Sequence, residues 1–237
     1  MEQRRHQLER GYLLHQRPYG DRDAVLEVFS REHGRLGLIA KGVRSGRSRR
    51  AGMLQPFGEL LLSWLTRGEL GVLQGLEPVQ TPLQLGGTAL VSGFYLNELL
   101  LRLLRRDDPH PELYDDYRRA VQLLAGGASE GYVLRVFEKQ LLASIGYGLI
   151  LEHDIDGQPI VPDAQYQYLA EMGPRLAPGP GSATVPGRAL LALAEESPQL
   201  EAHARELRGL LRAALAPHLG AEPLKSRELY RQFVRRQ

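Results

Sequence analysis

The sequence predicts an α+β protein in which a small five-stranded barrel comes first and an α-helical domain follows. Three observations indicate this order. Short apolar segments separated by Gly and Pro fill residues 1–80, and from about Gly87 the apolar residues recur at the helical period. A cluster of basic residues lies inside the strand-like part. With 237 residues, 43% of them hydrophobic, the chain is long enough to bury sizeable cores.

The strand-like part contains five segments that we expect to be β-strands, at residues 12–16, 24–30, 35–40, 59–65 and 70–77. Gly and Pro between them leave no room for helices of about ten residues, although the high Leu content keeps a helical alternative open. Five strands within residues 1–80 are typical of the OB-fold, a five-stranded Greek-key barrel that often binds nucleic acid.

Beyond Gly87, the 3.6-residue period and the capping signals predict a series of helices. Thr88 is a candidate cap for the first helix, which runs to Leu103, and Ser129 and Gly146 are candidate start and stop signals for the third. The expected helices are 88–103, 112–125, 130–145, 188–195, a long one from Ser197-Pro198 to Pro217, and 225–235. Tyr166 and Tyr168 alternate as in a small hairpin.

These segments predict four parts. Residues 1–80 form an OB-fold DNA-binding domain, and residues 81–147 a helical bundle. Residues 148–187, rich in Pro and Gly, form an irregular loop or hairpin insertion without cysteine. Residues 188–237 form C-terminal helices that pack on the bundle.

The segment Gly34–Gly58 holds six basic residues and no acidic one, between the third and fourth expected strands. Residues 1–80 carry a net charge of +4 and the rest of the chain −2, so the excess is local. Clustered Arg and Lys neutralise phosphates and release counterions, which favours a nucleic-acid partner; a solvated surface loop is the alternative. The candidate DNA-binding residues here are Arg35, Lys41, Arg44, Arg47, Arg49 and Arg50.

Other residues are weaker candidates for contacts with DNA. Arg35 stands at a strand start, where a purely structural role is the alternative. A second basic set near the C-terminus consists of Lys225, Arg227, Arg231, Arg235 and Arg236, the first three of which are the candidate DNA contacts, and cations that pair with a helix dipole are the alternative there. Tyr12 and Tyr19 are candidates for stacking on bases, whereas Phe29 and Trp64 are better explained as core residues.

Enzyme signatures are missing from the sequence. It contains no phosphate-binding Gly-x-x-x-x-Gly-Lys-Ser/Thr motif, no Gly-x-Ser-x-Gly elbow and no Cys. His153-Asp154-Ile155-Asp156-Gly157 is the one run resembling metal ligands, and a polar turn explains it better. We therefore assign no catalytic residue, no metal and no cofactor. The N-terminus is charged and no long apolar run occurs, so we expect a cytoplasmic protein that does not span a membrane.

Four blocks of the sequence resemble, in order, those of the bacterial recombination mediator family RecO. They are PYGDRDAVLEVFSREHGRLGLIAKGVRSGRSRRAGMLQPF, YLNELLLRLL, LRVFEKQLLASIGYGL and PLKSRELYRQF. The resemblance implies an N-terminal OB-fold and a central helical domain. It also implies binding of single- and double-stranded DNA, annealing of complementary strands, and association with the nucleoid. The implied partners are RecR and the single-stranded DNA-binding protein SSB, with which the family loads RecA.

The resemblance has one departure. Some family members carry a four-cysteine zinc module after the GYG motif, but the segment here begins LILEHDIDGQ and has no Cys, so zinc is not transferred to it.

The SSB tail is acidic and ends in an apolar residue, so its receptor should combine an apolar pocket with a basic rim. The run LRVFEKQLL offers both, and it includes the Leu-Arg-x-Phe-Glu motif of the family. The candidate tail-binding residues are Arg135, Lys139, Leu134 and Phe137. A solvated Arg on a bundle helix is the alternative.

The sequence thus favours a non-enzymatic DNA-repair mediator. Two alternatives stay open: a divalent-metal nuclease or phosphodiesterase that uses Asp154 and Asp156, and an adaptor whose basic segment binds an acidic protein.

Overall fold

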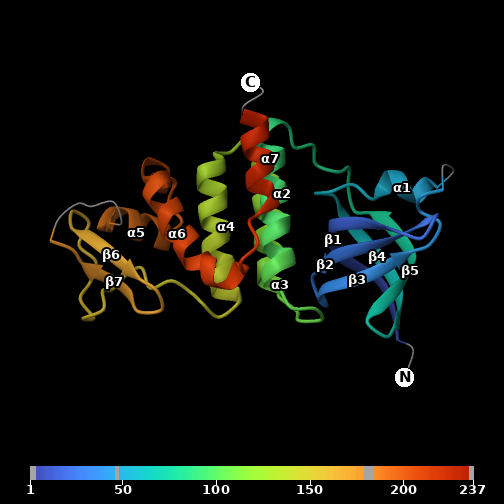
Figure 1. Cartoon of the computed structure of the whole chain (residues 1–237), viewed down its shortest axis with the longest axis horizontal. Helices are drawn as coiled ribbons and strands as arrows, with labels where there is room; N and C mark the ends of the chain where they lie inside the picture. The colour runs from blue at the N-terminus through green and yellow to red at the C-terminus, as the bar shows by residue number, and fades with distance from the viewer. Residues whose placement is uncertain (1–3, 46–47, 179–183, 235–237) are drawn as a thin grey trace. The chain divides into compact units, whose positions relative to one another are not determined.

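The computed structural model describes residues 4–45, 48–178 and 184–234. The chain divides into two compact units (Figure 1): unit 1 is Met1–Ala125 with Leu224–Gln237, and unit 2 is Gly126–Pro223. These two units group the elements differently from the expected four parts. The first two long helices and the last one belong with the barrel, and the third helix belongs with the segment expected to be an irregular insertion.

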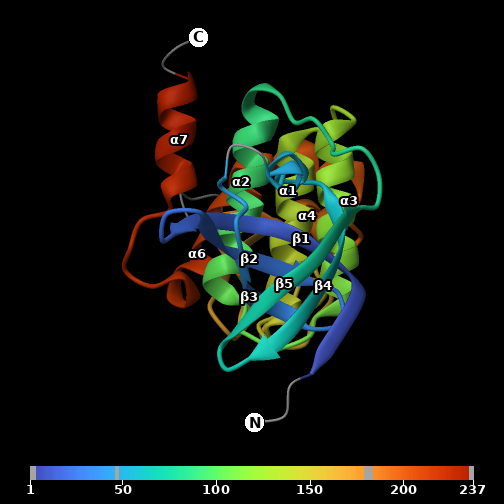
Figure 2. The same cartoon turned by 90° about the vertical axis from the view of Figure 1, so that its right-hand side faces the viewer.

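Unit 1 begins with a closed five-stranded barrel, which confirms the predicted fold class (Figure 2). Its strands are β1 (Arg5–Tyr19), β2 (Asp23–Ser30), β3 (Gly34–Ala40), β4 (Glu59–Arg67) and β5 (Leu70–Pro78). Their order in the barrel is β1-β2-β3-β5-β4, with β3 and β5 parallel and the other pairs antiparallel. All five expected strands are present. Four of them differ from the expected bounds by one or two residues, whereas β1 is 15 residues long and begins seven residues before the expected start at Tyr12.

The long strand β1 closes the barrel, because its first half pairs with β4 and its second half with β2. Gly11 lies where β1 passes between both neighbours, and an added Cβ there would stand 2.9 Å from a side-chain carbon of Leu62. Buried hydrophobic residues fill the interior. This core consists of Leu13, Ala24, Leu26, Val28, Leu36, Leu38, Ala40, Val43, Leu54, Leu60, Leu62, Trp64, Leu73 and Leu76.

Helices α2 (Gly87–Leu103) and α3 (Pro111–Ala125) follow the barrel, and the short α1 (Arg49–Met53) lies between β3 and β4. The expected cap of α2 is wrong: the helix begins one residue before Thr88, and Gly86 is its N-cap, without a side-chain hydrogen bond. The backbone of Gly86 is extended and that of Gly87 left-handed, a combination that glycine adopts readily.

The barrel and the two helices meet through buried aromatic rings. Tyr12 and Phe29 of the barrel pack against Tyr114 and Tyr117 of α3, with ring centroids 5.0 to 6.3 Å apart. Tyr12 is only 1% exposed, so the expectation that it offers a stacking face for bases is wrong. Phe29 and Trp64 are core residues, as expected.

Hydrogen bonds complete this contact. Asn97 of α2 donates to the Leu14 carbonyl (3.1 Å) and accepts from the Tyr117 hydroxyl (2.6 Å). The Tyr114 hydroxyl donates to the Glu59 carboxylate (3.0 Å), which also accepts a hydrogen bond from the Arg10 guanidinium (3.0 Å). Burial raises the pKa of both Tyr114 and Tyr117, so these hydroxyls remain protonated donors.

Helix α7 (Lys225–Val234) packs on α2 at the other end of the chain. A carboxylate holds its N-terminus: Glu98 accepts the backbone N–H groups of Lys225 and Ser226 and the Ser226 hydroxyl, at 2.9, 2.9 and 2.6 Å. Burial alone raises the pKa of Glu98, but the bonds from Ser226 and Lys225, together with Arg102, outweigh it and leave this pKa below its ordinary value.

Unit 2 combines helices with a three-stranded sheet of order β7-β6-β8. Its elements are α4 (Glu130–Ser144), β6 (Gln165–Leu169), β7 (Gly173–Leu176), β8 (Thr184–Pro186), α5 (Gly187–Ala194), the 3₁₀ helix η1 (Pro198–His203) and α6 (Ala204–Leu219). The expected hairpin at Tyr166 and Tyr168 is present as β6 and β7. Ser129 caps α4 as expected, accepting the N–H of Tyr132.

The long helix expected from Ser197 to Pro217 is two elements. Ser197 caps η1 through the N–H of Gln199, and α6 starts anew at Ala204. Pro217 lies inside the last turn of α6, and the helix continues to Leu219. In the described part of the chain, no helix has the length and apolar character needed to cross a bilayer.

We predict that Asn97→Ala destabilises the protein by about 2 kcal/mol or more, because two buried groups lose this partner. Urea denaturation measures the change. Gln122→Ala, an exposed change on α3, is the matched control and should have little effect. Equal stability of the two variants would contradict the role given to Asn97.

We also predict that acid releases α7. Because the folded pKa of Glu98 is depressed, its stabilising contribution is present above the ordinary Glu value of 4.5 and is lost as pH falls through the lower folded pKa. The chain has no Cys, so Arg231→Cys provides a single labelling site on exposed α7. Label anisotropy should drop on acidification, and Glu98→Gln should remove this step. Glu112→Gln, on α3, should retain it.

Candidate nucleic-acid interface

The basic loop, defined as residues 41–58, leaves the end of β3 and returns at the start of β4, as the sequence predicted. Lys41, Arg44 and Arg50 expose their side chains there. Arg49 is the first residue of α1, and Arg47 lies outside the described residues. The loop therefore presents several cations from one short segment.

The first part of the basic loop is fastened to the turn between β1 and β2. The N–H of Gly42 donates to Asp23 (2.7 Å), and the N–H of Arg44 donates to the Arg22 carbonyl (2.9 Å). The Arg44 guanidinium also reaches the Gly20 carbonyl at 3.2 Å. Gly42 has a φ of +66°, which favours glycine at this bend. These bonds place the loop's cations beside the β1–β2 turn.

This arrangement adds residues that the sequence interpretation missed. Arg17 and Arg22 are exposed on β1 and its turn, and Tyr19 between them is 52% exposed. An exposed aromatic ring among cations is typical of surfaces that bind single-stranded nucleic acid. In the sequence, these residues are visible only as the run Arg17-Pro18-Tyr19 at the end of β1. The fold is what brings this run next to the basic loop.

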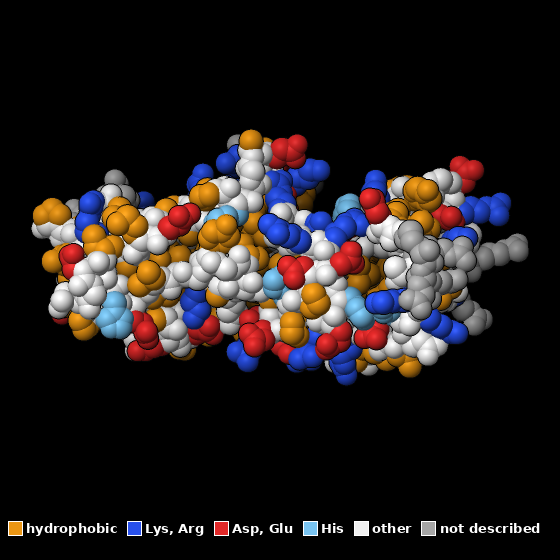
Figure 3. Space-filling model, turned by 90° about the horizontal axis from the view of Figure 1, so that it is seen from below, with side chains coloured by type: hydrophobic (Ala, Val, Ile, Leu, Met, Phe, Trp, Pro, Cys, Tyr) orange, Lys and Arg blue, Asp and Glu red, His pale blue; other side chains and the backbone are white. Residues whose placement is uncertain are grey.

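Arg50 ties the far part of the loop to the barrel, since its guanidinium donates to the Gln74 carbonyl of β5 at 2.9 Å. The loop is thus held at two places, the β1–β2 turn and β5. In the view of Figure 3, basic and acidic side chains lie interspersed. No patch of one charge sign marks an interface in this view, so the assignment rests on the local arrangement around the basic loop.

Arg35 belongs to a different part of unit 1. Its guanidinium donates to the Leu101 carbonyl of α2, and its own carbonyl accepts the N–H of Asp107 (2.9 Å). Burial lowers the pKa of Arg35, and Arg106 beside it forms an ion pair with Glu27. Arg35 is half-buried and fastens the segment after α2 to the barrel, so its assignment as an exposed DNA contact is wrong.

Three members of the second basic set, Lys225, Arg227 and Arg231, lie on α7 and are all exposed, and Arg235 and Arg236 lie outside the described residues. Lys225 is the first residue of the helix and Arg231 lies in its last turn. Glu228 stands between them in the sequence. The helix anchored by Glu98 thus carries three exposed cations, of which Arg227 and Arg231 lie one turn apart on the same side of the helix and Lys225 lies on another side.

The predicted tail-binding set is not an open patch. Arg135 is 5% and Phe137 1% exposed, and Arg135 pairs with the buried Glu138 at 2.6 Å, one helical turn away. Lys139 is partly buried and pairs with Glu196 at 2.8 Å, and Leu134 is half-buried. The expectation of an exposed Arg135 is wrong, because α4 turns this side chain into the protein and supplies its counter-ion.

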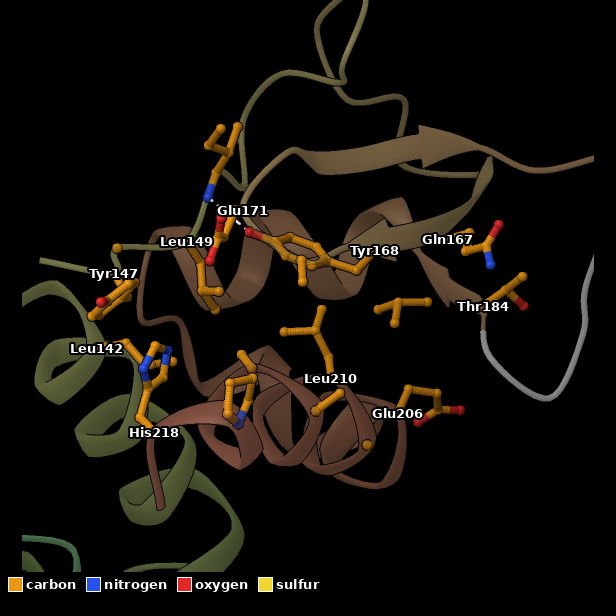
Figure 4. Close-up of a pocket in the computed structure, with 18 of the residues that line it drawn as sticks. Leu142, Tyr147, Leu149, Gln167, Tyr168, Glu171, Thr184, Glu206, Leu210 and His218 are labelled. Atoms are coloured by element: carbon orange, nitrogen blue, oxygen red, sulfur yellow. Dashed lines mark hydrogen bonds between the residues drawn. The ribbon is translucent and has the colours of Figure 1, made fainter. Parts of the chain in front are cut away.

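A cavity of about 790 Å³ lies elsewhere in unit 2 (Figure 4). Leu149, Tyr168 and Leu210 point into it, and the Tyr168 hydroxyl accepts the N–H of Ile150 at 3.0 Å. The rings of Tyr147 and His218 lie against each other at one side, with centroids 3.9 Å apart. The lining also includes exposed Arg205 and Glu206 of α6, so an apolar interior has a charged edge.

The run His153–Gly157 forms a turn. One carboxylate oxygen of Asp154 accepts the N–H groups of Asp156 (3.0 Å) and Gln158 (2.8 Å). This pattern is an Asx turn extended by one bond. Among the described residues, Asp154 and Asp156 belong to no group of three ligating side chains.

Comparison with known proteins agrees with this architecture. Residues 5–82 match the family model described as recombination protein O N terminal, and residues 85–228 match recombination protein O C terminal. A protein named DNA repair protein RecO from Alkalilimnicola ehrlichii is 48% identical over 94% of this chain and 90% of its own length. Proteins of the same name from Methylococcus capsulatus and Nitrosococcus oceani are 45% and 44% identical, over 94% and 96% of this chain and 93% and 94% of their own lengths. The chain belongs to the recombination protein O (RecO) family.

Proposed function

We propose that this protein is a non-enzymatic DNA-repair mediator that binds single- and double-stranded DNA and anneals complementary strands. The observation that carries the proposal is the basic loop held against the β1–β2 turn, which gathers Lys41, Arg44, Arg17 and Arg22 around exposed Tyr19. Membership of a family whose relatives are named DNA repair proteins supports it.

The chemistry of this surface suits phosphate contact with little base preference. Arg and Lys bind phosphates irrespective of sequence, and a single ring such as Tyr19 stacks on any base. Cations between two backbones also screen their mutual repulsion, which lowers the cost of bringing complementary strands together. The α7 set, with Lys225, Arg227 and Arg231, offers a second place for a strand.

We further propose that the cavity of unit 2 receives the SSB tail, in place of the buried residues around Arg135. Its apolar interior suits the tail's terminal hydrophobic residue, and Arg205 at the edge suits the acidic residues before it. With RecR as a further partner, the protein would then act on SSB-coated DNA in the cytoplasm and help load RecA.

Two other functions give different outcomes in one assay. Labelled single strands incubated with the protein and magnesium should be retained intact if it is a mediator. A nuclease using Asp154 and Asp156 would cleave them, but Asp154 is already engaged by two backbone N–H groups of its own turn. An adaptor for an acidic protein would not retain them.

We predict that DNA affinity depends steeply on salt. If Lys41, Arg44, Arg47, Arg49, Arg50, Arg17 and Arg22 each contact a single-strand phosphate, the slope of log K against log salt is about −5, at about −0.7 per contact. Replacing Arg17 and Arg22 with Ala should make the slope shallower by about 1.4 and weaken binding to all sequences alike.

The matched control removes the same charge from α3 and the segment before it, with Arg105→Ala and Arg119→Ala, both exposed. This variant should keep the wild-type slope. Equal slopes in the two double variants would move the DNA site away from the β1–β2 turn.

We predict that Arg205→Glu weakens binding of a peptide copying the SSB tail about tenfold or more, which corresponds to about 1.4 kcal/mol. Arg208→Glu is the matched control, because residue 208 is exposed on the same helix but does not line the cavity. Fluorescence anisotropy of the peptide measures both. Equal losses of peptide affinity in the two variants would mean that overall charge, and not the cavity, attracts the peptide. Binding of naked DNA should be unchanged in both variants.

A further inference from the structure

Three side chains with metal-ligating atoms meet on the barrel: His6, Glu9 and His33. One ligand atom from each lies within 4.8 Å of the other two, and all three residues are half-buried. Residues 6 and 33 are far apart in the sequence, so no spacing motif announces the cluster. Within the described ranges it is the one group of three or more His, Cys, Asp or Glu residues arranged in this way.

A β-bulge brings two of these residues to one face. In a regular strand, residues three apart point to opposite faces, so His6 and Glu9 would diverge. The pairing of β1 with β4 shifts register between them, and Leu8 adopts a left-handed φ of +54°. The N–H of Leu8 donates to the Ser63 hydroxyl at 3.0 Å, which helps hold the bulge. A left-handed Leu is costly, and such bulges often re-aim side chains at functional sites.

The turn between β2 and β3 supplies the third residue. Gly34 follows His33 with a φ of +66°, and an added Cβ there would stand 1.9 Å from the Asp108 carbonyl oxygen, so only glycine fits. The N–H of Arg31 donates to the Arg10 carbonyl at 3.1 Å and holds the turn against β1. His33 Nε2 then lies 3.8 Å from Glu9 Oε1.

Neighbouring side chains fix the ring of His6. It stacks on Trp64, with centroids 4.5 Å apart and planes 11° from parallel. Its Nε2 lies 3.2 Å from the Thr66 hydroxyl, within hydrogen-bonding distance. The His33 ring meets it edge-on at 4.6 Å. Both imidazoles are therefore oriented before any ligand arrives, which lowers the entropic cost of binding one.

We propose that His6, Glu9 and His33 form a binding site for a divalent transition-metal ion, with zinc as the first candidate. Two imidazole nitrogens and one carboxylate oxygen suit zinc, cobalt and nickel, whereas magnesium and calcium prefer oxygen ligands throughout. Water completes the coordination. The ion links the start of β1 to the β2–β3 turn, so its role is to staple the barrel, and the site is independent of the proposed DNA surface.

The chain carries its own reporter for this site, because Trp64 is the only tryptophan and lies against His6. Full-length protein without an affinity tag is stripped with a chelator and titrated with cobalt or nickel, whose open-shell ions quench nearby indole fluorescence. We expect quenching that saturates at one ion per chain and is reversed by added zinc, with one zinc retained after desalting by elemental analysis. Zinc should also raise the denaturation midpoint.

Variants separate the site from adventitious binding. His33→Asn and Glu9→Gln should each weaken the quenching titration at least ~10-fold, because even the partners of a metal ligand contribute 10- to 100-fold to affinity. His153→Asn, an exposed histidine in unit 2, should leave it unchanged. If His33→Asn does not fold, the proposal is tested by the metal affinity of Glu9→Gln and by the effect of zinc on the denaturation midpoint of the wild-type protein. Absence of stoichiometric binding, or equal affinity in Glu9→Gln and His153→Asn, would overturn the proposal.

Discussion

Tyr114 and Tyr117 of α3 lie between the barrel and the helices of unit 1, and the rest of that unit depends on how these two rings are buried. Their rings pack against Tyr12 and Phe29 in tilted and edge-on contacts, and their hydroxyls donate to Glu59 and Asn97. A buried ring with an unpartnered hydroxyl would be costly, so the contact tolerates only one arrangement of α2 and α3 on the barrel. It also withdraws Tyr12 from solvent and thereby removes that part of β1 from any role in stacking on DNA.

Because of this contact, the two ends of β2 have different surroundings. Its last residues pair with the part of β1 that meets the helices, and the turn that follows carries His33 and is tied to α3 by the ion pair of Arg31 with Asp115 (3.0 Å). Its first residues lie beside the β1–β2 turn and the basic loop. One end of the barrel is thus engaged in packing and in the proposed metal site, and the other is open for the proposed DNA contact.

Unit 2 contains a buried ion pair. Arg135 and Glu138 both lie on the buried side of α4, and their opposite charges balance each other within the helix. A buried pair of this kind adds little net stability, because the cost of removing both charges from water offsets their attraction. An open apolar surface of unit 2 lies in the cavity lined by α6 and the small sheet, where Arg205 is an exposed cation, whereas Arg135 is buried.

The sequence by itself determined part of the local structure: the presence of the five strands, the position of the basic loop between β3 and β4, the cap at Ser129 and the hairpin at Tyr166. Turn residues, period and capping act over a few residues, so a single sequence carries them. Tertiary structure decided which charges remain exposed. Arg35 and Arg135 look like other arginines in the sequence, but a carbonyl of α2 and a carboxylate one turn away engage them. It also brought Arg17 and Arg22 to the basic loop, and His6 to His33, because strand pairing and a bulge join residues that no sequence pattern connects.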